Sequence, residues 1–194
     1  MVSAQLNGKR IAILVEDGFE QIELTGPRQA LDDAGALTEI VSPRPAFVKG
    51  WQHDHWGDQL PVDVPLDRAS AENYDALLLP GGVMNPDKLR INRDALEFVK
   101  AFFIAGKPVA AICHGPWTLI DAGVVGGITV TSWPSLHTDL TNAGAKWIDR
   151  PVIVDQGLVT SRKPDDIPAF NEKMIEEFAE GVHAEQSETA ESAS

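Results

Sequence analysis

The chain has 194 residues, of which 43% are hydrophobic, and its 16 Lys plus Arg against 29 Asp plus Glu give a formal charge of −13. This composition is typical of a globular protein and excludes a chain that is disordered throughout. The length favours one domain with a sizeable core. The negative charge opposes binding to nucleic acids and to anionic membrane surfaces, and no basic patch offsets it.

The single cysteine, Cys113, excludes an internal disulfide and a four-thiolate metal site within one chain. The start of the chain has no apolar stretch that resembles a signal peptide. No apolar run approaches the roughly 18 residues of a membrane-spanning helix. We therefore expect a cytoplasmic protein that neither spans nor binds a membrane.

The first part of the chain predicts a strand–helix–strand unit and then an excursion. The apolar run at 11–15 indicates a buried parallel strand. Helical spacing follows over about 20–34, up to the glycine at 35, and a second strand is predicted at 37–41. Residues 43–63 contain three prolines and two tryptophans, which favours a small hairpin outside the main sheet.

The rest of the chain repeats the alternation of strands and helices. Strands are predicted at 76–79, 108–112, 128–131, 146–148, 151–155 and 158–161, and helices at 92–105, 117–122, 135–143 and 167–180. This alternation predicts an α/β fold with a mainly parallel sheet. We expect a single domain over 1–181, followed by an acidic, disordered tail over 182–194 that is rich in Ala, Ser and Glu.

Cys113 stands where an apolar strand gives way to a glycine-containing turn and a helix, in Ala111-Ile112-Cys113-His114-Gly115. A small residue, a nucleophile and a glycine at this spacing are typical of a nucleophile elbow. At the start of a helix, the dipole and the free N–H groups would stabilise a thiolate, giving a thiol of low pKa. The alternative is a buried structural cysteine, since a free Cys packs as a small hydrophobe.

Two neighbours of this elbow are further candidates. His114 could act as a base if the turn brings its ring to the thiol, or it could be a structural loop histidine. The turn Pro80-Gly81-Gly82 ends the neighbouring strand, and a glycine N–H there could join the N–H of His114 in an oxyanion hole. Alone, such a turn is weak support, because most turns that end strands have no catalytic role.

Glu20 and Glu23 are three residues apart, which places them on one face of the first helix at the carboxyl edge of a strand. They could simply favour the helix dipole. A carboxyl that faces the thiol could instead donate a hydrogen bond or move a proton. Trp117, in the helix after the elbow, is a secondary candidate for the site.

His53, Asp54 and His55 have side chains that suit a divalent metal ion, but the pattern favours a polar loop between two tryptophans. We treat His53 and His55 as weak candidates only and expect no metal. No glycine motif has the spacing and lysine of a phosphate-binding loop, so we also expect no nucleotide cofactor.

These segments together resemble the PfpI family, within the superfamily of PfpI-type peptidases, glyoxalase III and protein deglycases on a fold like that of class I glutamine amidotransferases. The resemblance covers most of the chain and appears in family order, in Phe19-Glu20-Gln21-Ile22-Glu23-Leu24, Leu78-Leu79-Pro80-Gly81-Gly82, Gly106-Lys107-Pro108-Val109-Ala110-Ala111-Ile112-Cys113-His114-Gly115-Pro116, Thr131-Ser132-Trp133-Pro134 and Asn142-Ala143-Gly144-Ala145-Lys146-Trp147.

The resemblance implies a flavodoxin-like three-layer sandwich that assembles as a dimer or hexamer. It also implies that Cys113 is the nucleophile, that Glu23 is the carboxyl beside it, and that Gly82 and His114 supply N–H groups. In the peptidase form a carboxylate of a neighbouring subunit orients the histidine. The match here is Asp87, where the family pattern has Glu and a loop that is one residue shorter.

Four functions follow from this resemblance. The leading one is cofactor-independent attack of Cys113 on small aldehydes such as methylglyoxal, or on glycated proteins or peptides, giving a hydroxy acid. The others are a cysteine peptidase, a redox-sensing stress protein or chaperone, and a glutamine amidotransferase. The last would need a His-x-Glu downstream, as in His183-Ala184-Glu185.

Overall fold

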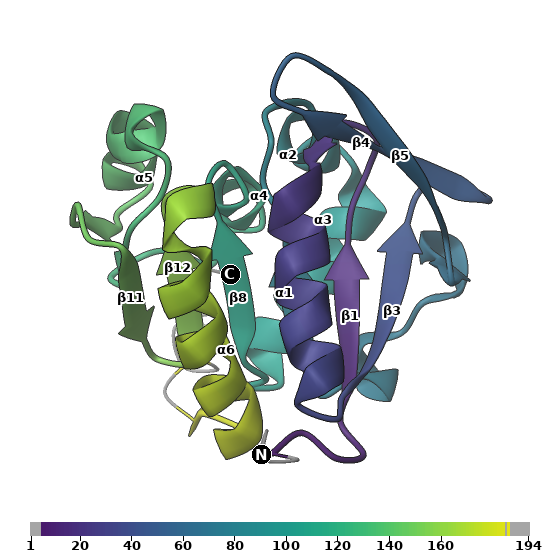
Figure 1. The fold of residues 1–194 in the computed structure, drawn as a ribbon. Helices are drawn as coiled ribbons and strands as arrows, with labels where there is room; N and C mark the ends of the chain where they lie inside the picture. The colour runs from purple at the N-terminus through teal and green to yellow at the C-terminus, as the bar shows by residue number, and fades with distance from the viewer. Residues whose placement is uncertain (1–4, 185, 187–194) are drawn as a thin grey trace.

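The computed structural model describes residues 5–184 and 186 and has a seven-stranded sheet as its central layer (Figure 1). The strand order is β11-β12-β8-β7-β1-β3-β6, and every neighbouring pair is parallel except β11 with β12. These strands are β1 (Arg10–Leu14), β3 (Leu37–Ser42), β6 (Val64–Pro65), β7 (Ala76–Leu79), β8 (Val109–Ile112), β11 (Val152–Asp155) and β12 (Leu158–Ser161).

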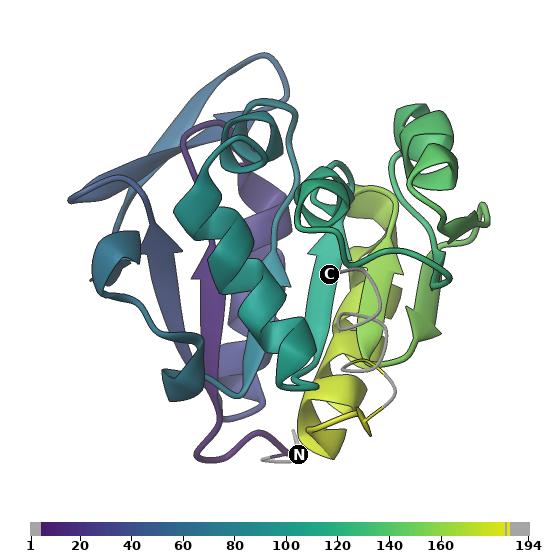
Figure 2. The same cartoon turned by 180° about the vertical axis from the view of Figure 1, so that it is seen from behind.

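Helices cover both faces of this sheet. Seen from the side of Figure 1, α1 (Gln21–Asp33) and α6 (Ile167–Glu180) lie in front, and Figure 2 shows α3 (Arg93–Ile104) across the opposite face. The shorter helices are α2 (Met84–Leu89), α4 (Pro116–Asp121) and α5 (His137–Asn142), with 3-10 turns at Leu66–Arg68, Ala71–Asn73, Pro134–Leu136 and Pro164–Asp166. The result is the expected three-layer sandwich.

Alternating side chains of the central strands build two separate cores. In β1, Ile11 and Ile13 pack into the core under α1 and α6, whereas Ala12 and Leu14 pack into the core on the α3 side. Both sets are fully buried. This double burial explains why the sequence reads as an unbroken apolar run rather than as an alternating strand.

The segment at 43–63 forms the expected hairpin outside the main sheet, from β4 (Phe47–Gln52) and β5 (His55–Pro61). A two-residue strand, β2 (Phe19–Glu20), pairs with β4 and makes a small three-stranded sheet. The side chain of Gln21 then fastens the hairpin to α1, because it donates to Oδ2 of Asp58 and accepts from the Asp58 N–H, both at 2.7 Å. A second small sheet pairs β9 (Thr129–Val130) with β10 (Lys146–Trp147).

The end of the chain contacts the domain beyond the predicted boundary at 181. The N–H of His183 donates to the carbonyl oxygen of Gly106 at 2.7 Å, and Gln186 is buried. The rest of the segment predicted as a tail, residue 185 and residues 187–194, lies outside the described residues. The extent of a disordered tail therefore stays a prediction.

Candidate active site

The strand order places several loops at one edge of the sheet. Because β1, β7 and β8 are parallel neighbours, their carboxyl ends meet there. The chain crosses from β1 to α1 on one face and from β7 to α3 on the other, so this edge is a topological switch point. Ligands of open α/β sheets bind at such a point. Glu23 follows β1, the Pro80-Gly81-Gly82 turn follows β7, and Cys113 follows β8.

Cys113 has the strained backbone of a nucleophile elbow. Its φ angle is 63°, in the left-handed region that residues other than glycine rarely adopt. Three hydrogen bonds from backbone N–H groups to backbone carbonyl oxygens fix the turn. The Cys113 N–H donates to Ser161 at 3.0 Å, and the carbonyl oxygen of Cys113 accepts from the Trp133 N–H at 2.9 Å. The Gly115 N–H donates to Ile112 at 2.9 Å. The thiol therefore projects from a rigid support.

Four groups surround the thiol. Nδ1 of His114 lies 3.2 Å from its Sγ, so the turn brings the neighbouring ring to the sulfur. The backbone N–H groups of Gly82 and His114 point at the sulfur, and the carboxyl of Glu23 interacts with it. These two N–H groups are the pair that the sequence indicated for an oxyanion hole.

Glu23 is fully buried below the thiol. Its Oε2 accepts the Gly81 N–H at 3.0 Å, whereas its Oε1 has no hydrogen-bond partner among the described residues. Burial, reinforced by the nearby charge of Glu20, raises the pKa of Glu23 to about 8. At neutral pH this carboxyl holds its proton and can act as an acid.

The turn after β7 must be glycine because the backbones meet so closely. A Cβ on Gly81 would lie 2.6 Å from Cβ of Cys113, and Gly82 has a φ of 76° with no room for a Cβ beside Gly18. Asn85, which sequence reasoning missed, holds this turn: its buried amide donates to the carbonyl oxygens of Pro80 and Gly81. This role depends on how the turn folds, and no motif in the sequence indicated it.

The expected low pKa of the thiol is not what the structure gives. Cys113 is only 6% exposed, and burial raises its pKa, as does the neighbouring carboxyl of Glu23. The N–H groups of Gly82 and His114 act in the opposite direction but are outweighed. Moreover, α4 has only six residues, so the dipole invoked for the thiolate is short. The resting group is therefore a thiol that must lose its proton when it reacts.

His114 is positioned to take that proton. Its ring packs against the edge of Trp117 and stacks on Trp133, with Ser135 Oγ at 3.4 Å from Nε2. Burial lowers the pKa of His114 to about 4, so the imidazole is neutral at pH 7 and Nδ1 can accept a proton. Trp117 thus supports the histidine and is not among the residues that line the pocket.

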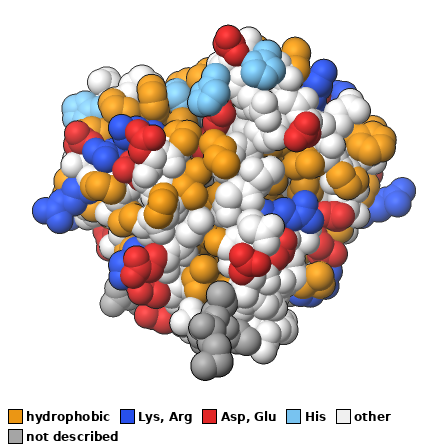
Figure 3. Space-filling model, in the orientation of Figure 1, with side chains coloured by type: hydrophobic (Ala, Val, Ile, Leu, Met, Phe, Trp, Pro, Cys, Tyr) orange, Lys and Arg blue, Asp and Glu red, His pale blue; other side chains and the backbone are white. Residues whose placement is uncertain are grey.

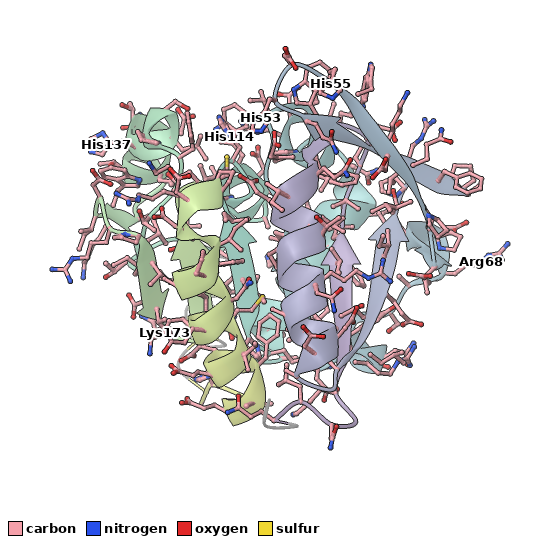
Figure 4. All side chains as sticks on the ribbon, viewed as in Figure 1. His53, His55, Arg68, His114, His137 and Lys173 are labelled. Carbon is pink, nitrogen blue, oxygen red and sulfur yellow. The ribbon has the colours of Figure 1, made fainter. Side chains whose placement is uncertain are left out.

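A pocket of about 560 Å³ opens above the thiol. In the view of Figure 3, histidine side chains lie along the top of the molecule, with hydrophobic side chains between them. In Figure 4, His53 and His114 lie beside each other there, whereas His55 lies farther out on the hairpin. The lining residues are Gly18, Glu20, Glu23, Trp51, His53, Gly82, Val83, Met84, Cys113, His114, Trp133, Lys163, Pro164 and Asp165.

The remaining candidates lie elsewhere or have other partners. Asp87 is exposed in the first turn of α2 instead of in a loop, and His114 contacts Cys113 and Ser135 rather than Asp87 within the described chain. His55 pairs with Asp54 through Nδ1 at 2.8 Å. The group of three potential metal ligands found in the described part of the chain does not include His53 or His55.

Groups at the far end of the fold do not join this site. His183 lies beside Gly106 and Gly157, which precede β8 and β12, at the edge of the sheet opposite to Cys113. The glutamine amidotransferase hypothesis, which would need this histidine at the thiol, is therefore wrong on that point. The glutamate of the same His-x-Glu triplet, at position 185, lies outside the described residues. Within the described chain, His183 forms a cluster of potential metal ligands with Glu177 and Glu180, also remote from Cys113.

The buried carboxyl predicts a pH-dependent stability. Folding raises the pKa of Glu23 from 4.5 to about 8, so the folded chain keeps a proton that the unfolded chain loses between these values. The resulting contribution to stability is fully present below about pH 4.5 and is lost as the pH rises through 8, by up to about 1.4 kcal/mol per pH unit. Glu23→Gln should therefore gain stability relative to wild type from pH 5 to 8 and then level off.

Urea unfolding of both proteins at pH 5.5, 7 and 8.5 measures this difference. The lowered pKa of His114 makes an opposite contribution, which grows from pH 4 to 6.5, but both proteins share it and it cancels. If the difference in free energy of unfolding between the two proteins were the same at all three pH values, the pKa of Glu23 would not be raised by folding.

The fold and the site together define an α/β protein with a cysteine at the elbow, a histidine at the sulfur and a buried carboxyl beside it. A family model described as the DJ-1/PfpI family matches residues 9–177, and the chain belongs to this family.

Among the described residues, no helix is both long enough and apolar enough to cross a bilayer.

Relatives with different names share most of the chain. General stress protein 18 of Bacillus subtilis is 44% identical over 170 residues, which is 87% of this chain and 96% of its own. YraA of the same organism, named as a candidate cysteine protease, is 41% identical over 86% of this chain and 96% of its own. A deglycase of Pyrococcus abyssi is 39% identical over 86% of this chain and 97% of its own.

Solved structures have the same architecture. A two-domain protein of Anabaena variabilis, with a DJ-1/ThiJ/PfpI-like and a ferritin-like domain, superposes with a TM-score of 0.81 at 34% identity, over 87% of this chain and 47% of that chain. DJ-1beta of Drosophila melanogaster gives a TM-score of 0.80 at 26% identity, over 95% and 96% of the two chains.

Proposed function

We propose that the protein is a stress-protective, cofactor-independent enzyme that converts reactive carbonyl compounds or their protein adducts into hydroxy acids. One arrangement supports this above all. The Cys113 sulfur lies between a neutral imidazole and a carboxyl that holds its proton, with two N–H groups directed at it. The deglycase among the relatives is consistent with such chemistry.

For methylglyoxal, the first step forms a bond from Sγ of Cys113 to the aldehyde carbon. The thiol proton passes to Nδ1 of His114, and the aldehyde oxygen takes the proton of Glu23. The N–H groups of Gly82 and His114 stabilise the charge that develops on this oxygen. The product is a hemithioacetal, and no metal or nucleotide takes part.

The second stage moves hydrogen between the neighbouring carbons. The hemithioacetal carbon gives its hydrogen as a proton to the Glu23 carboxylate, which returns a proton to the adjacent carbon. His114 carries the proton between the two oxygens. Oε1 of Glu23 is suited to this transfer because it has no partner in the described chain. Water hydrolyses the resulting thioester. The departing Cys113 sulfur takes the proton held on His114, the carboxylic acid formed gives its proton to Glu23, and lactate leaves with the starting site restored.

The first experiment is a direct assay of this reaction. Purified protein, without glutathione, should consume methylglyoxal and release an equal amount of lactate. Bovine serum albumin, at the same concentration of thiol, is the control for spontaneous adduct formation. Methylglyoxal that disappears without lactate would exclude the proposed hydrolysis.

A cysteine peptidase is the second candidate, because Cys113 and His114 form a Cys–His pair and a relative is named as a candidate protease. In this reading we propose that Asp87, exposed on α2, orients His114 of a neighbouring copy in a dimer or hexamer. The redox-sensing reading has less support, because a buried thiol of raised pKa is a poor target for oxidation.

A further inference from the structure

The pocket is much larger than the proposed small aldehyde requires. Its volume of about 560 Å³ lies within the range of ~300–1,000 Å³ that is usual for sites of drug-sized ligands. Cys113, Glu23 and His114 are three of the fourteen lining residues, and methylglyoxal bound to the sulfur would leave most of the volume unfilled. The rest of the lining therefore bears on the identity of the substrate.

The remaining lining is mainly apolar and partly open to solvent. Its apolar residues are Trp51, Val83, Met84, Trp133 and Pro164, and Glu20, His53, Lys163 and Asp165 line the same pocket. Val83 is 54% exposed and Trp133 is 39% exposed, so two large apolar side chains face solvent at the pocket. Exposed apolar groups that gather around a concave site indicate a ligand with apolar surface.

The two indole rings are held in place before any ligand arrives. Trp51 donates from Nε1 to the carbonyl oxygen of His53 at 2.8 Å, and its ring meets Trp56 edge to face at 5.3 Å. The Gln21–Asp58 pair fastens this hairpin to α1. The backbone N–H of Trp133 donates to the carbonyl oxygen of Cys113, and the Trp133 ring stacks on His114. Fixed aromatic surfaces of this kind bind apolar groups at low entropic cost.

We propose that the preferred substrates are 2-oxoaldehydes that carry an aromatic or similarly large apolar group, bound against Trp51 and Trp133 while the aldehyde reaches Cys113. This inference rests on the proposed function and adds its substrate class. Phenylglyoxal is the matching probe. By the same isomerisation and hydrolysis it would give mandelate, with one water consumed and no external oxidant or reductant.

The test compares kcat/KM for phenylglyoxal and for methylglyoxal. Wild type should favour phenylglyoxal by about 10-fold or more. Trp51→Ala should remove most of this preference, because the loss of the indole would raise the KM for phenylglyoxal more than the KM for methylglyoxal. Trp56→Phe is the matched control, because it changes a tryptophan of the same hairpin outside the pocket and keeps an aromatic edge for Trp51.

The outcomes separate the two proposals. Lactate formed from methylglyoxal without any preference for phenylglyoxal would overturn the substrate class and leave the proposed function in place. An unchanged preference in Trp51→Ala would overturn the role of the tryptophan wall. Turnover of neither compound would remove the proposed function itself.

Discussion

Cys113→Ser is expected to lower the rate of lactate formation from methylglyoxal by about 10⁴-fold or more, to the rate without protein. Serine keeps nearly the same volume and the same strained backbone, but its hydroxyl is a far weaker nucleophile than a thiol in this setting. An alcohol is also a weaker acid than a thiol, so the imidazole of His114 removes the serine proton less readily. The assay is initial-rate production of lactate at pH 7.

The composition of the chain supplies a strong control. Cys113 is the single cysteine, so one alkylation per chain, read from the intact mass, should abolish activity completely. Matching thermal unfolding of wild type and Cys113→Ser shows that the fold is retained. Lactate formation that survives either change would exclude a covalent mechanism at this sulfur.

Glu23→Gln is expected to lower kcat/KM by about 10²- to 10⁴-fold, the usual contribution of a positioned acid or base. Glutamine preserves the size of the side chain and can still accept the Gly81 N–H through its oxygen. It cannot donate a carboxylic proton to the substrate or return one to carbon. The loss should appear mainly in kcat, because the affected steps follow binding.

The pH dependence of activity distinguishes an acid–base role of Glu23 from a purely structural one. Activity of the wild type should rise as His114 loses its proton near pH 4 and fall as Glu23 ionises near pH 8. The upper limb should vanish in Glu23→Gln. Glu20→Gln is the matched control, since Glu20 lines the same pocket but is only partly buried, and it should stay within a few-fold of wild type. An equal loss in both variants would deny Glu23 a specific role.

Local patterns were sufficient to predict most of the framework. The strand at 76–79 is found as β7 with the same bounds, and the last helix, predicted over about 167–180, is found as α6 over Ile167–Glu180. Their apolar periodicity and terminal glycines are local signals. The helix α2 was missed because it has six residues and contains Pro86, and β2 is a two-residue strand that depends on pairing with the hairpin.

The site was only partly predictable, because burial is a tertiary property. The motif around Cys113 indicated the elbow. Whether the pKa of the thiol is raised or lowered depends instead on its burial in the fold and on the neighbouring Glu23. Local spacing also treated Glu20 and Glu23 alike. In the fold, Glu20 precedes α1 and stays partly exposed, whereas Glu23 is completely enclosed. Trp51, which lines the same pocket, comes from a hairpin that no sequence motif connected to the thiol.

The protonation of the resting site affects how reactants reach it. At pH 7 the imidazole of His114 is neutral, the carboxyl of Glu23 is protonated and the Cys113 thiol is uncharged, so the reacting groups carry no net charge in a chain of formal charge −13. Under the proposed function, an uncharged carbonyl compound should therefore enter by unbiased diffusion, at a rate that ionic strength hardly alters. Anionic compounds, by contrast, would be repelled by the field of the whole chain, so under the proposed function an uncharged aldehyde would reach the thiol more readily than an anionic one.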